Sequence, residues 1–374
     1  MGGLKQAAKA ACAAALHHTG ARRVLAAAAR FSAGGRRVLI LAYHRVVEDF
    51  DRDAQRVIPG LLVSAKTFER HLQEVRRARF DIVPLTEALE VNAGLRQPRR
   101  DVAVITFDDG YRDNFDVGFP VLQRLGVPAT IFLPTHFIGS DERLPHDRLF
   151  HLLRLTHARN RRDPGTFERV GGGDAWAPLI RLDPVEAVEK FIANWPHAQV
   201  LSAIDALAAR LREPAMPHDG ALLDWDQCRA LQRSGLVTFG AHTVRHVPLH
   251  REDATSVAWE LGEAKGVIER QLGVPCRDFA FPNGFYSRAL VEALIHAGYR
   301  SALTTEDAQN RVGGDPFQLR RKTLWENHSR GLFGTHSDAL LGCQVDSVFG
   351  TLGLQRPVLG DFTQGVGGVA EANA

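Results

Sequence analysis

The sequence predicts an α/β fold, a barrel of parallel βα units interrupted by a helical insertion. Continuously apolar runs of strand length alternate with amphipathic helical segments over most of the 374 residues, as in proteins with a parallel sheet. Seven or eight such runs are present, and nearly all are followed by a helix, which favours a barrel over an open sheet. A stretch from about 140 to 224 carries helical stripes instead of strand-like runs, and we expect it to form the insertion.

The expected strands are rich in aliphatic and β-branched residues and end at polar or turn-forming residues. The first runs from Arg37 to Tyr43 and ends at His44. The same reasoning places further strands at 80–84, 102–107, 129–133, 236–239, 279–281, 300–304 and 319–324.

The expected helices are delimited by capping residues. Ser64 precedes a helix with Phe68, Leu72 and Val75 on one face,. Two features indicate helices in the insertion: the Asp183-Pro184 pair is typical of a helix start, and an apolar stripe follows it. The stripe is formed by Leu201, Ile204, Leu207 and Leu211. Other helices are expected from about Thr86, up to Gly126, from Asp224 to Gly235, up to Gly273 and up to Gly298,.

Three regions follow from this pattern. Residues 1–36 are expected to form a basic, Ala-rich helical arm, 37–325 the barrel with its insertion at about 140–224, and 326–374 a C-terminal extension. From about Gly350 the extension is rich in Gly and Val without periodicity, so we expect it to be partly disordered.

The charge is distributed unevenly along the chain. A net charge of +3 is too small to indicate a nucleic-acid partner. The first 45 residues nevertheless hold eight Lys or Arg and no Asp or Glu. This pattern suits a helical arm lying on an anionic membrane surface, or else an Ala-rich helix that packs loosely on the barrel.

The sequence favours a location in the cytoplasm or on the inner membrane surface. No apolar run approaches the ~18 residues that a transmembrane helix needs, and the short stretch at 7–16 is interrupted by Lys9, which makes it a poor signal-peptide core. Four cysteines without C-x-x-C spacing are too few for a disulfide scaffold, and we expect buried free thiols.

Asp108 and Asp109 follow directly after the apolar strand expected at 102–107 and are followed by Gly110. Successive residues at a strand end point to opposite sides, so one acid can bind a metal while the other faces a substrate. Adjacent carboxylates repel each other unless a cation relieves the repulsion. The alternative is that one aspartate caps the next helix while the other is solvated.

His242 and His246 follow another expected strand, and residues four apart on a helical turn share one face,. Two such imidazoles are frequent zinc ligands. The chain has 16 histidines, so the spacing by itself is weak. The pairs His146–His151 and His328–His336 have no buried strand before them, and we expect them to be structural.

His44 is the third histidine placed at a strand end. Because the pKa of an imidazole lies near neutrality, His44 is a candidate general acid. The alternative is a buried histidine hydrogen-bonded at the barrel rim.

Together these segments resemble the polysaccharide deacetylases, the carbohydrate esterase family 4 or NodB-homology domain. Thr106-Phe-Asp-Asp-Gly-Tyr111 and His242-Thr-Val-Arg-His246 are similar to the first two motifs of that family. Leu41-Ala-Tyr-His44-Arg-Val46 and Phe279-Ala-Phe-Pro-Asn-Gly284 resemble motifs of its branch of poly-N-acetylglucosamine deacetylases. The resemblance runs from about Val38 to Leu324, and it implies an irregular seven-stranded (β/α) barrel.

The resemblance also implies roles for individual residues. One divalent metal is expected, most often Zn²⁺, although Co²⁺, Ni²⁺ and Mn²⁺ also suit a site of two histidines and an aspartate. The matching positions are Asp109, His242 and His246 for the metal, Asp108 for the catalytic base, His44 for the general acid, the backbone N–H of Tyr111 for the oxyanion, and Pro282 and Asn283 for substrate contacts.

Two departures from the family pattern concern acid–base chemistry. Ala280 stands where most of the wider family has an arginine, and no late Leu-x-His motif is present. His44 must then act as the acid, and Arg320 and Arg321 are the candidates to supply a cation near Asp108.

The function expected from the sequence is metal-dependent removal of N-acetyl groups from amino sugars of a poly- or oligosaccharide, such as an exopolysaccharide or a cell-envelope glycan. Its expected partner is therefore an acetylated glycan. Three alternatives stay open at this point. The chain could be a glycan-binding module with little turnover, an O-acetyl esterase or amidase acting on another substrate, or a membrane-surface protein that works mainly through its basic arm.

Overall fold

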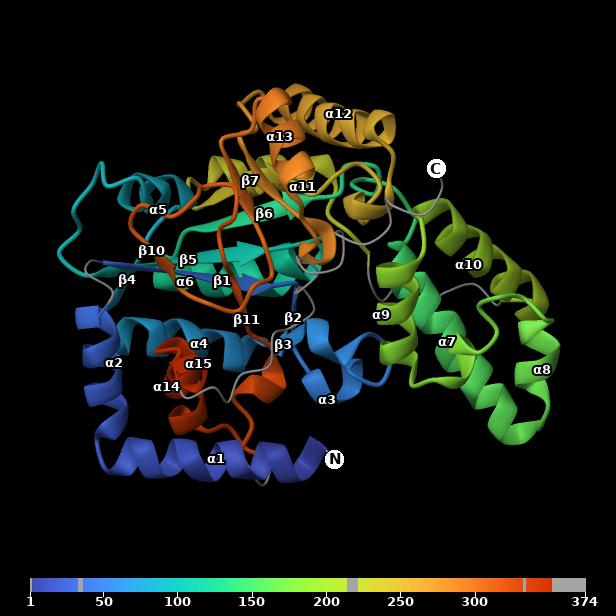
Figure 1. The fold of residues 1–374 in the computed structure, drawn as a ribbon, viewed down its shortest axis with the longest axis horizontal. Coiled ribbons are helices and arrows are strands. Elements are labelled where there is room, and N and C mark those ends of the chain that lie inside the picture. Colours follow the sequence, from blue (N-terminus) through green and yellow to red (C-terminus); the bar gives the residue numbers. More distant parts are fainter. Residues whose placement is uncertain (1, 33–35, 214–220, 332–333, 352–374) are drawn as a thin grey trace, which may run out of the picture.

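The computed structural model describes residues 2–32, 36–213, 221–331 and 334–351. The predicted disordered tail from about Gly350 lies almost wholly outside the described residues. The predicted α/β barrel architecture is confirmed: a curled sheet forms the centre, with helices packed around it (Figure 1).

Six parallel strands make up the main part of the sheet. They lie side by side in chain order, and each is hydrogen-bonded to the next. Residues of β1 and β5 are buried throughout, which explains why their sequences are almost continuously apolar after the first residue, since strands covered on both faces need no alternation. The six are β1 (Arg37–Tyr43), β5 (Asp101–Phe107), β6 (Ala129–Leu133), β7 (Val237–Ala241), β8 (Asp278–Ala280) and β9 (Ser301–Leu303).

A seventh segment joins β9 back to β1. The N–H of Leu319 donates to the carbonyl of Ala302 (3.0 Å), and the N–H of Thr304 donates to the carbonyl of Leu319 (2.8 Å). A few residues later β11 (Lys322–Thr323) pairs in parallel with β1. The strand predicted at 319–324 is therefore present as two short pieces, and it connects the two ends of the curled sheet.

Four short strands complete the described sheet structure. β4 (Phe80–Ile82) pairs with the first half of β5, and β10 (Asn310–Arg311) pairs antiparallel with the start of β1. β2 (Arg45–Val47) and β3 (Leu62–Ser64) form a separate two-stranded sheet that the sequence reasoning did not predict.

Helices cover the outside of the barrel at the expected places. The side chains of Ser64, Asp224 and Ser287 cap helix N-termini by accepting a backbone N–H, as such residues do. The helices are α4 (Ala65–Arg77), α5 (Leu85–Asn92), α6 (Phe119–Leu125), α11 (Trp225–Arg233), α12 (Ala254–Leu272) and α13 (Arg288–His296), with shorter turns at α3 (Phe50–Asp53), η1 (Pro59–Leu61), η2 (Asn114–Gly118), η4 (Leu249–Arg251), η5 (Pro282–Gly284) and η6 (Glu326–His328).

The predicted helical insertion forms a lobe beside the barrel, at the right of Figure 1. It has a hydrophobic cluster of its own, to which Ile204, Leu207 and Leu211 of the predicted stripe contribute. The fourth member of that stripe, Leu201, is 36% exposed and lies outside the cluster. The lobe consists of α7 (Pro145–Arg162), α8 (Thr166–Gly171), η3 (Leu179–Arg181), α9 (Pro184–Asn194) and α10 (His197–Leu211).

The two ends of the described chain pack against each other, at the bottom of Figure 1. Ala10 and Ala13 of α1 (Gly2–His18) are buried against Leu340 and Cys343 of α14 (Asp338–Val345). The helices α2 (Ala21–Ser32) and α15 (Val348–Thr351) lie beside them. Cys228, Cys276 and Cys343 are buried free thiols and Cys12 is a half-buried one.

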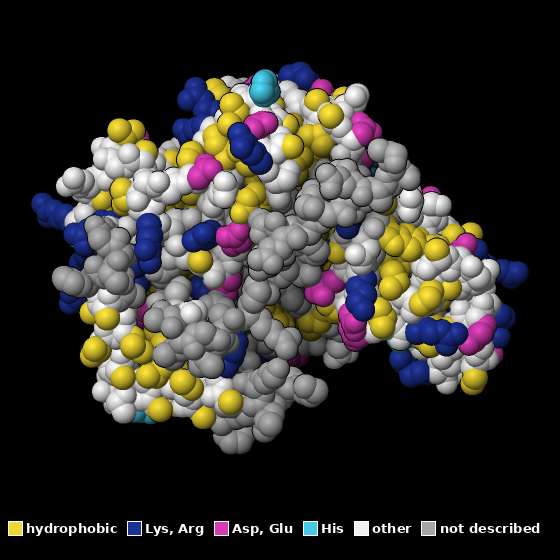
Figure 2. All heavy atoms as spheres, viewed as in Figure 1, with side chains coloured by type: hydrophobic (Ala, Val, Ile, Leu, Met, Phe, Trp, Pro, Cys, Tyr) yellow, Lys and Arg dark blue, Asp and Glu magenta, His cyan; other side chains and the backbone are white. Residues whose placement is uncertain are grey.

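Several basic residues among the first 45 form ion pairs inside the molecule. Arg22 lies 2.7 Å from Glu74, Arg37 pairs with Asp101 (2.8 Å) and Arg45 with Asp113 (2.7 Å). Figure 2 shows hydrophobic side chains rather than a dense basic patch over α1 and α2 on the visible face. No helix in the described ranges is long and apolar enough to cross a membrane.

Candidate active site at the carboxyl ends of the strands

Asp108 and Asp109 lie at the carboxyl end of β5. The Asp108 N–H donates to the Tyr43 carbonyl (3.0 Å), which continues the pairing with β1. Asp109 (φ 70°) and Gly110 (φ 64°) then adopt left-handed conformations. A Cβ at position 110 would lie 2.6 Å from a methyl group of Leu133, so only glycine fits this turn. The turn directs the two adjacent carboxylates to different partners.

His242 and His246 belong to a loop, not to the helical turn that the spacing predicted. Thr243 and His246 have φ values of 66° and 55°, and these two left-handed residues bring the imidazoles together, with ring centroids 4.9 Å apart. The carboxylate of buried Glu260 on α12 accepts the N–H groups of Val244 (2.7 Å) and Arg245 (3.1 Å). A carboxylate that satisfies two consecutive loop amides holds the loop in this shape.

Asp109, His242 and His246 form a compact, buried group. Their potential ligand atoms all lie within 4.8 Å of one another. Oδ1 of Asp109 is 3.1 Å from Nε2 of His246 and 3.6 Å from Nε2 of His242. Three residues distant in the sequence are thus neighbours in space, as a shared ion would require.

The donor atoms also fit a divalent ion chemically. Because a carbonyl can only accept, Nδ1 of His242 carries the proton donated to the Ala280 carbonyl (2.7 Å), which leaves Nε2 free as a ligand. Burial lowers the pKa of His242 to about 4, so the imidazole is neutral near pH 7. Buried Oδ1 of Asp109 accepts no aligned hydrogen bond from any described residue. The three residues could therefore hold a metal ion.

Asp108 is clamped by one of the two candidate arginines. Nη1 and Nη2 of Arg321 donate to its two carboxylate oxygens (2.7 and 2.8 Å), while Nε donates to the Thr304 carbonyl (2.8 Å). Burial raises the pKa of Asp108, but attraction to Arg321 and His242 outweighs it and lowers the pKa below the ordinary value. Arg320 instead pairs with Glu306 (2.9 Å) at the surface.

We expect the buried Asp108–Arg321 pair to contribute measurably to folding. The Arg321→Gln substitution should lower the free energy of unfolding by about 3–5 kcal/mol, because it leaves a buried carboxylate without its partner. The matched Arg320→Gln substitution breaks an exposed pair and should cost less than about 1 kcal/mol. Urea denaturation of both variants checks this, and similar losses in the two would contradict it.

His44 lies between β1 and β2, at the same edge of the sheet as the aspartates. It is close enough to Asp108 and Asp109 to interact with both electrostatically. Its backbone carbonyl is fixed by the side chain of Asn114 (2.7 Å). Buried Nδ1 of His44 has no hydrogen-bond partner among the described residues, so no described protein group fixes the tautomer of the ring through this nitrogen.

Tyr111 is held by its side chain and leaves its backbone N–H unused. Its hydroxyl donates to Asp147 (2.9 Å), and its ring lies beneath Arg45 (4.8 Å). The flanking residues bond to 221–223 across an antiparallel bridge, which turns the Tyr111 N–H away from that segment. Within the described ranges this N–H has no acceptor.

Pro282 and Asn283 follow β8 at the same edge of the sheet. Pro282 is buried, and Asn283 has a left-handed φ of 58°. Nδ2 of Asn283 is buried without a partner in the described parts of the chain. Their role as substrate contacts stays a prediction.

His146, which the sequence predicted to be structural, lies beside the candidate site. His146 is the second residue of α7. Its Nε2 is 3.9 Å from Oδ2 of Asp109 and 2.9 Å from the Tyr111 hydroxyl. Its ring centroid is 5.0 Å from that of His246. No strand precedes His146, and the only local signal is Pro145 at a helix start, so the sequence offered no reason to place it here.

Comparisons with known proteins bear on the family and the fold of the chain. A family model described as polysaccharide deacetylase matches residues 96–302. The structure of IcaB from Ammonifex degensii is similar with a TM-score of 0.53 at 18% identity, over 83% of this chain and 98% of that chain. At such low identity the likeness shows the fold alone.

Two curated relatives match parts of the chain. YxkH of Bacillus subtilis (strain 168) is 33% identical over 90 residues, which are 24% of this chain and 32% of YxkH. The poly-beta-1,6-N-acetyl-D-glucosamine N-deacetylase of Staphylococcus epidermidis is 32% identical over 124 residues, 31% of this chain and 40% of that enzyme. The matched part is therefore less than half the length of either relative.

Proposed function

Because the chain belongs to the polysaccharide deacetylase family, we propose that it is a metal-dependent hydrolase that removes N-acetyl groups from amino sugars of a poly- or oligosaccharide. The observation that carries this proposal is the buried group of Asp109, His242 and His246 directly beside the Asp108–Arg321 pair. It combines residues that could hold a metal with an ionised carboxylate, and a metal-activated water together with a general base can hydrolyse an amide.

The residues divide the chemistry among them. Asp108, kept ionised by Arg321, takes the proton of the water that attacks the acetyl carbon. A divalent ion held by Asp109, His242 and His246 would supply Lewis-acid assistance and favour ionisation of water. Zinc is our first choice, while cobalt, nickel and manganese suit the same donors.

The remaining steps are the stabilisation of the oxyanion and the protonation of the leaving nitrogen. The free N–H of Tyr111 donates to the oxyanion of the tetrahedral intermediate, and one such donor is worth about 3–4 kcal/mol of barrier. His44 protonates the departing amine, which is otherwise a poor leaving group. The C–N bond then breaks, giving acetate and the free amino sugar.

Acetate release from a panel of substrates tests this proposal. The metal-loaded protein is incubated with N-acetylglucosamine oligomers of different linkage, with O-acetylated glycans and with non-sugar acetamides. We expect acetate from the N-acetylated glycans. No release from any of them, or faster release from the O-acetyl esters or from the non-sugar amides, would contradict an N-deacetylase.

A further inference from the structure

The side chain of Tyr111 is fully buried and is held by residues from three parts of the chain. Its hydroxyl lies 2.9 Å from Oδ2 of Asp147 and 2.9 Å from Nε2 of His146. Its ring lies beneath the guanidinium of Arg45, which pairs with Asp113 (2.7 Å). Both the ring and the hydroxyl are therefore fixed.

The available protons show which way each hydrogen bond to this hydroxyl runs. A phenol carries one proton and a carboxylate can only accept, so the Tyr111 hydroxyl donates to Asp147,. The phenol oxygen then accepts, and the proton of the second bond lies on Nε2 of His146,. The same Nε2 is 3.9 Å from Oδ2 of Asp109. His146 is thus a hydrogen-bond donor beside the site, and in this arrangement its Nε2 has no lone pair to offer a metal.

His146 and Asp147 connect Tyr111 to the helical lobe. They are the second and third residues of α7, and the later residues Leu149 and Leu152 of the same helix are buried in the hydrophobic cluster of the lobe. One turn of helix therefore links the Tyr111 hydroxyl to the core of the lobe.

The turn that carries Tyr111 is also held where the chain returns from the lobe. The N–H of Arg112 donates to the Ala221 carbonyl (2.9 Å), and the Gly110 carbonyl accepts the N–H of Leu223 (2.8 Å). The start and the end of the insertion therefore both hold this turn.

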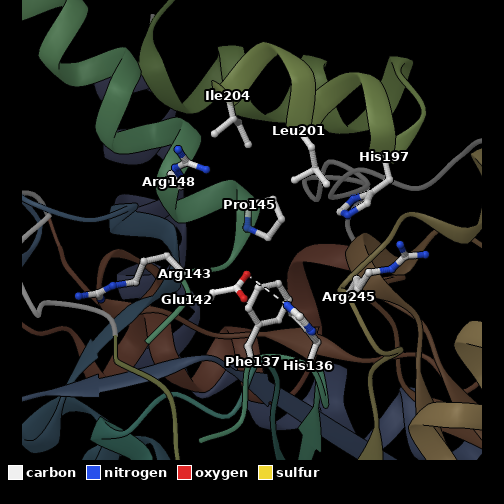
Figure 3. A pocket seen from close by; sticks show the side chains of 10 residues that line it. All are labelled: His136, Phe137, Glu142, Arg143, Pro145, Arg148, His197, Leu201, Ile204 and Arg245. Atoms are coloured by element: carbon white, nitrogen blue, oxygen red, sulfur yellow. Dashed lines mark hydrogen bonds and ion pairs between the residues drawn. The ribbon is translucent and has the colours of Figure 1, made fainter. Parts of the chain in front are cut away.

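Figure 3 shows the junction of lobe and barrel beside α7, where a pocket of about 110 Å³ lies between them. Pro145, the first residue of α7, lines this pocket together with Leu201 and Ile204 of α10 and Phe137 of the loop after β6. The lobe and the barrel are not closely packed on this side of α7, so hydrogen bonds hold its first turn to Tyr111.

The orientation of Tyr111 matters because its backbone N–H is the proposed oxyanion donor. Such a donor acts when it lies about 2.7–3.1 Å from the oxyanion, and a misplacement of about 1 Å can cost about a hundredfold in rate. The side chain and the peptide of one residue share its Cα, so fixing the ring and the hydroxyl limits rotation of the N–H.

We propose that Asp147 and His146 are positioning residues, which hold Tyr111 so that its backbone N–H meets the oxyanion. The inference rests on the proposed function and deepens it, because it makes the helical lobe part of the reaction machinery. Neither residue needs to touch the substrate or the metal. The lobe thereby contributes to the rate of the chemical step.

Steady-state acetate release in a double-mutant cycle tests the proposal. Asp147→Ala removes the acceptor of the Tyr111 hydroxyl and should lower kcat by about 10- to 100-fold, with KM and metal affinity unchanged. Asp147→Asn keeps an oxygen that can accept the same bond, so most of kcat should return. Tyr111→Phe should cause a similar loss, and combining it with Asp147→Ala should cost little more, because both changes remove one shared interaction.

His146→Leu removes the second partner of the hydroxyl. It should also lower kcat and leave KM and metal affinity unchanged, as equilibrium dialysis of the purified variant measures. Loss of metal binding in His146→Leu would overturn its positioning role and make it a metal ligand.

Asp278→Ala is the matched control. Asp278 is as exposed as Asp147 (9% each), and its carboxylate also accepts a hydroxyl, that of Ser301 (2.7 Å), but it begins β8 at the opposite edge of the sheet. The variant should leave kcat per folded molecule unchanged. An unchanged kcat in Asp147→Ala, or equal losses in the two aspartate variants, would overturn the proposal.

Hydrogen exchange of the metal-loaded protein without substrate separates this proposal from the proposed function. The backbone N–H groups of Arg112 and Asn114 are both hydrogen-bonded (2.9 Å each), so their exchange reports opening of the turn. Both should exchange faster in Asp147→Ala and at the unmodified rate in Asp278→Ala. If they do while no protein releases acetate, only the proposed function fails. Unchanged exchange in Asp147→Ala overturns the positioning role whatever the turnover.

Discussion

The Asp108→Asn variant is expected to bind its metal normally and to lose about a hundredfold to ten-thousandfold in kcat. Asparagine has nearly the shape of aspartate but cannot take a proton from water, and a positioned general base contributes about that factor. The metal-binding group of Asp109, His242 and His246 is untouched. Steady-state acetate release, together with elemental analysis of the purified variant, measures both properties.

Asp101→Asn is the matched control for this loss. Asp101 lies at the opposite end of β5, is likewise buried, and likewise pairs with an arginine, Arg37 (2.8 Å). Its substitution also breaks a buried ion pair, but at a distance from the reaction centre. We expect activity per folded molecule to survive in Asp101→Asn. If Asp108→Asn keeps its activity, or if both variants lose it alike, Asp108 is not the base.

Removal of the metal is the second change with a large expected effect. A chelator should abolish acetate release, and Zn²⁺, Co²⁺, Ni²⁺ or Mn²⁺ should restore it to different degrees. His242→Gln should weaken metal binding by more than the about 10- to 100-fold typical of losing an outer partner of a ligand, because here a direct donor is lost. Equilibrium dialysis with elemental analysis measures the affinity without reference to turnover.

His151→Gln serves as the control for the histidine substitution. His151 is on α7, only five positions after His146, but its surroundings are Glu213, Arg154 and Arg143. The variant should bind metal with unchanged affinity. Stoichiometric, tight metal binding by His242→Gln would mean that the three residues are not the metal site, and a fully active chelated protein would remove the metal from the mechanism.

Local features of the sequence were sufficient to place the two aspartates and His44. Each follows an apolar run long enough to be a buried strand, and a parallel sheet brings the carboxyl ends of such strands to one edge. The same reasoning placed His242 after β7. It failed for the form of the 242–246 segment, because two left-handed residues held by Glu260 leave no signature in the spacing of the histidines.

The sequence by itself therefore determined where the strands end and which polar residues lie at those ends. Local hydrophobic patterns are sufficient for this, because they indicate which segments are buried strands and in which direction the chain leaves them. Only the tertiary structure decided which distant groups complete the site. Arg321 and not Arg320 faces Asp108 because neighbouring residues of an extended segment point to opposite sides,. The position of His146 and the pocket between the lobe and the barrel depend on how the lobe docks against the barrel. No local sequence pattern predicts long-range packing of that kind.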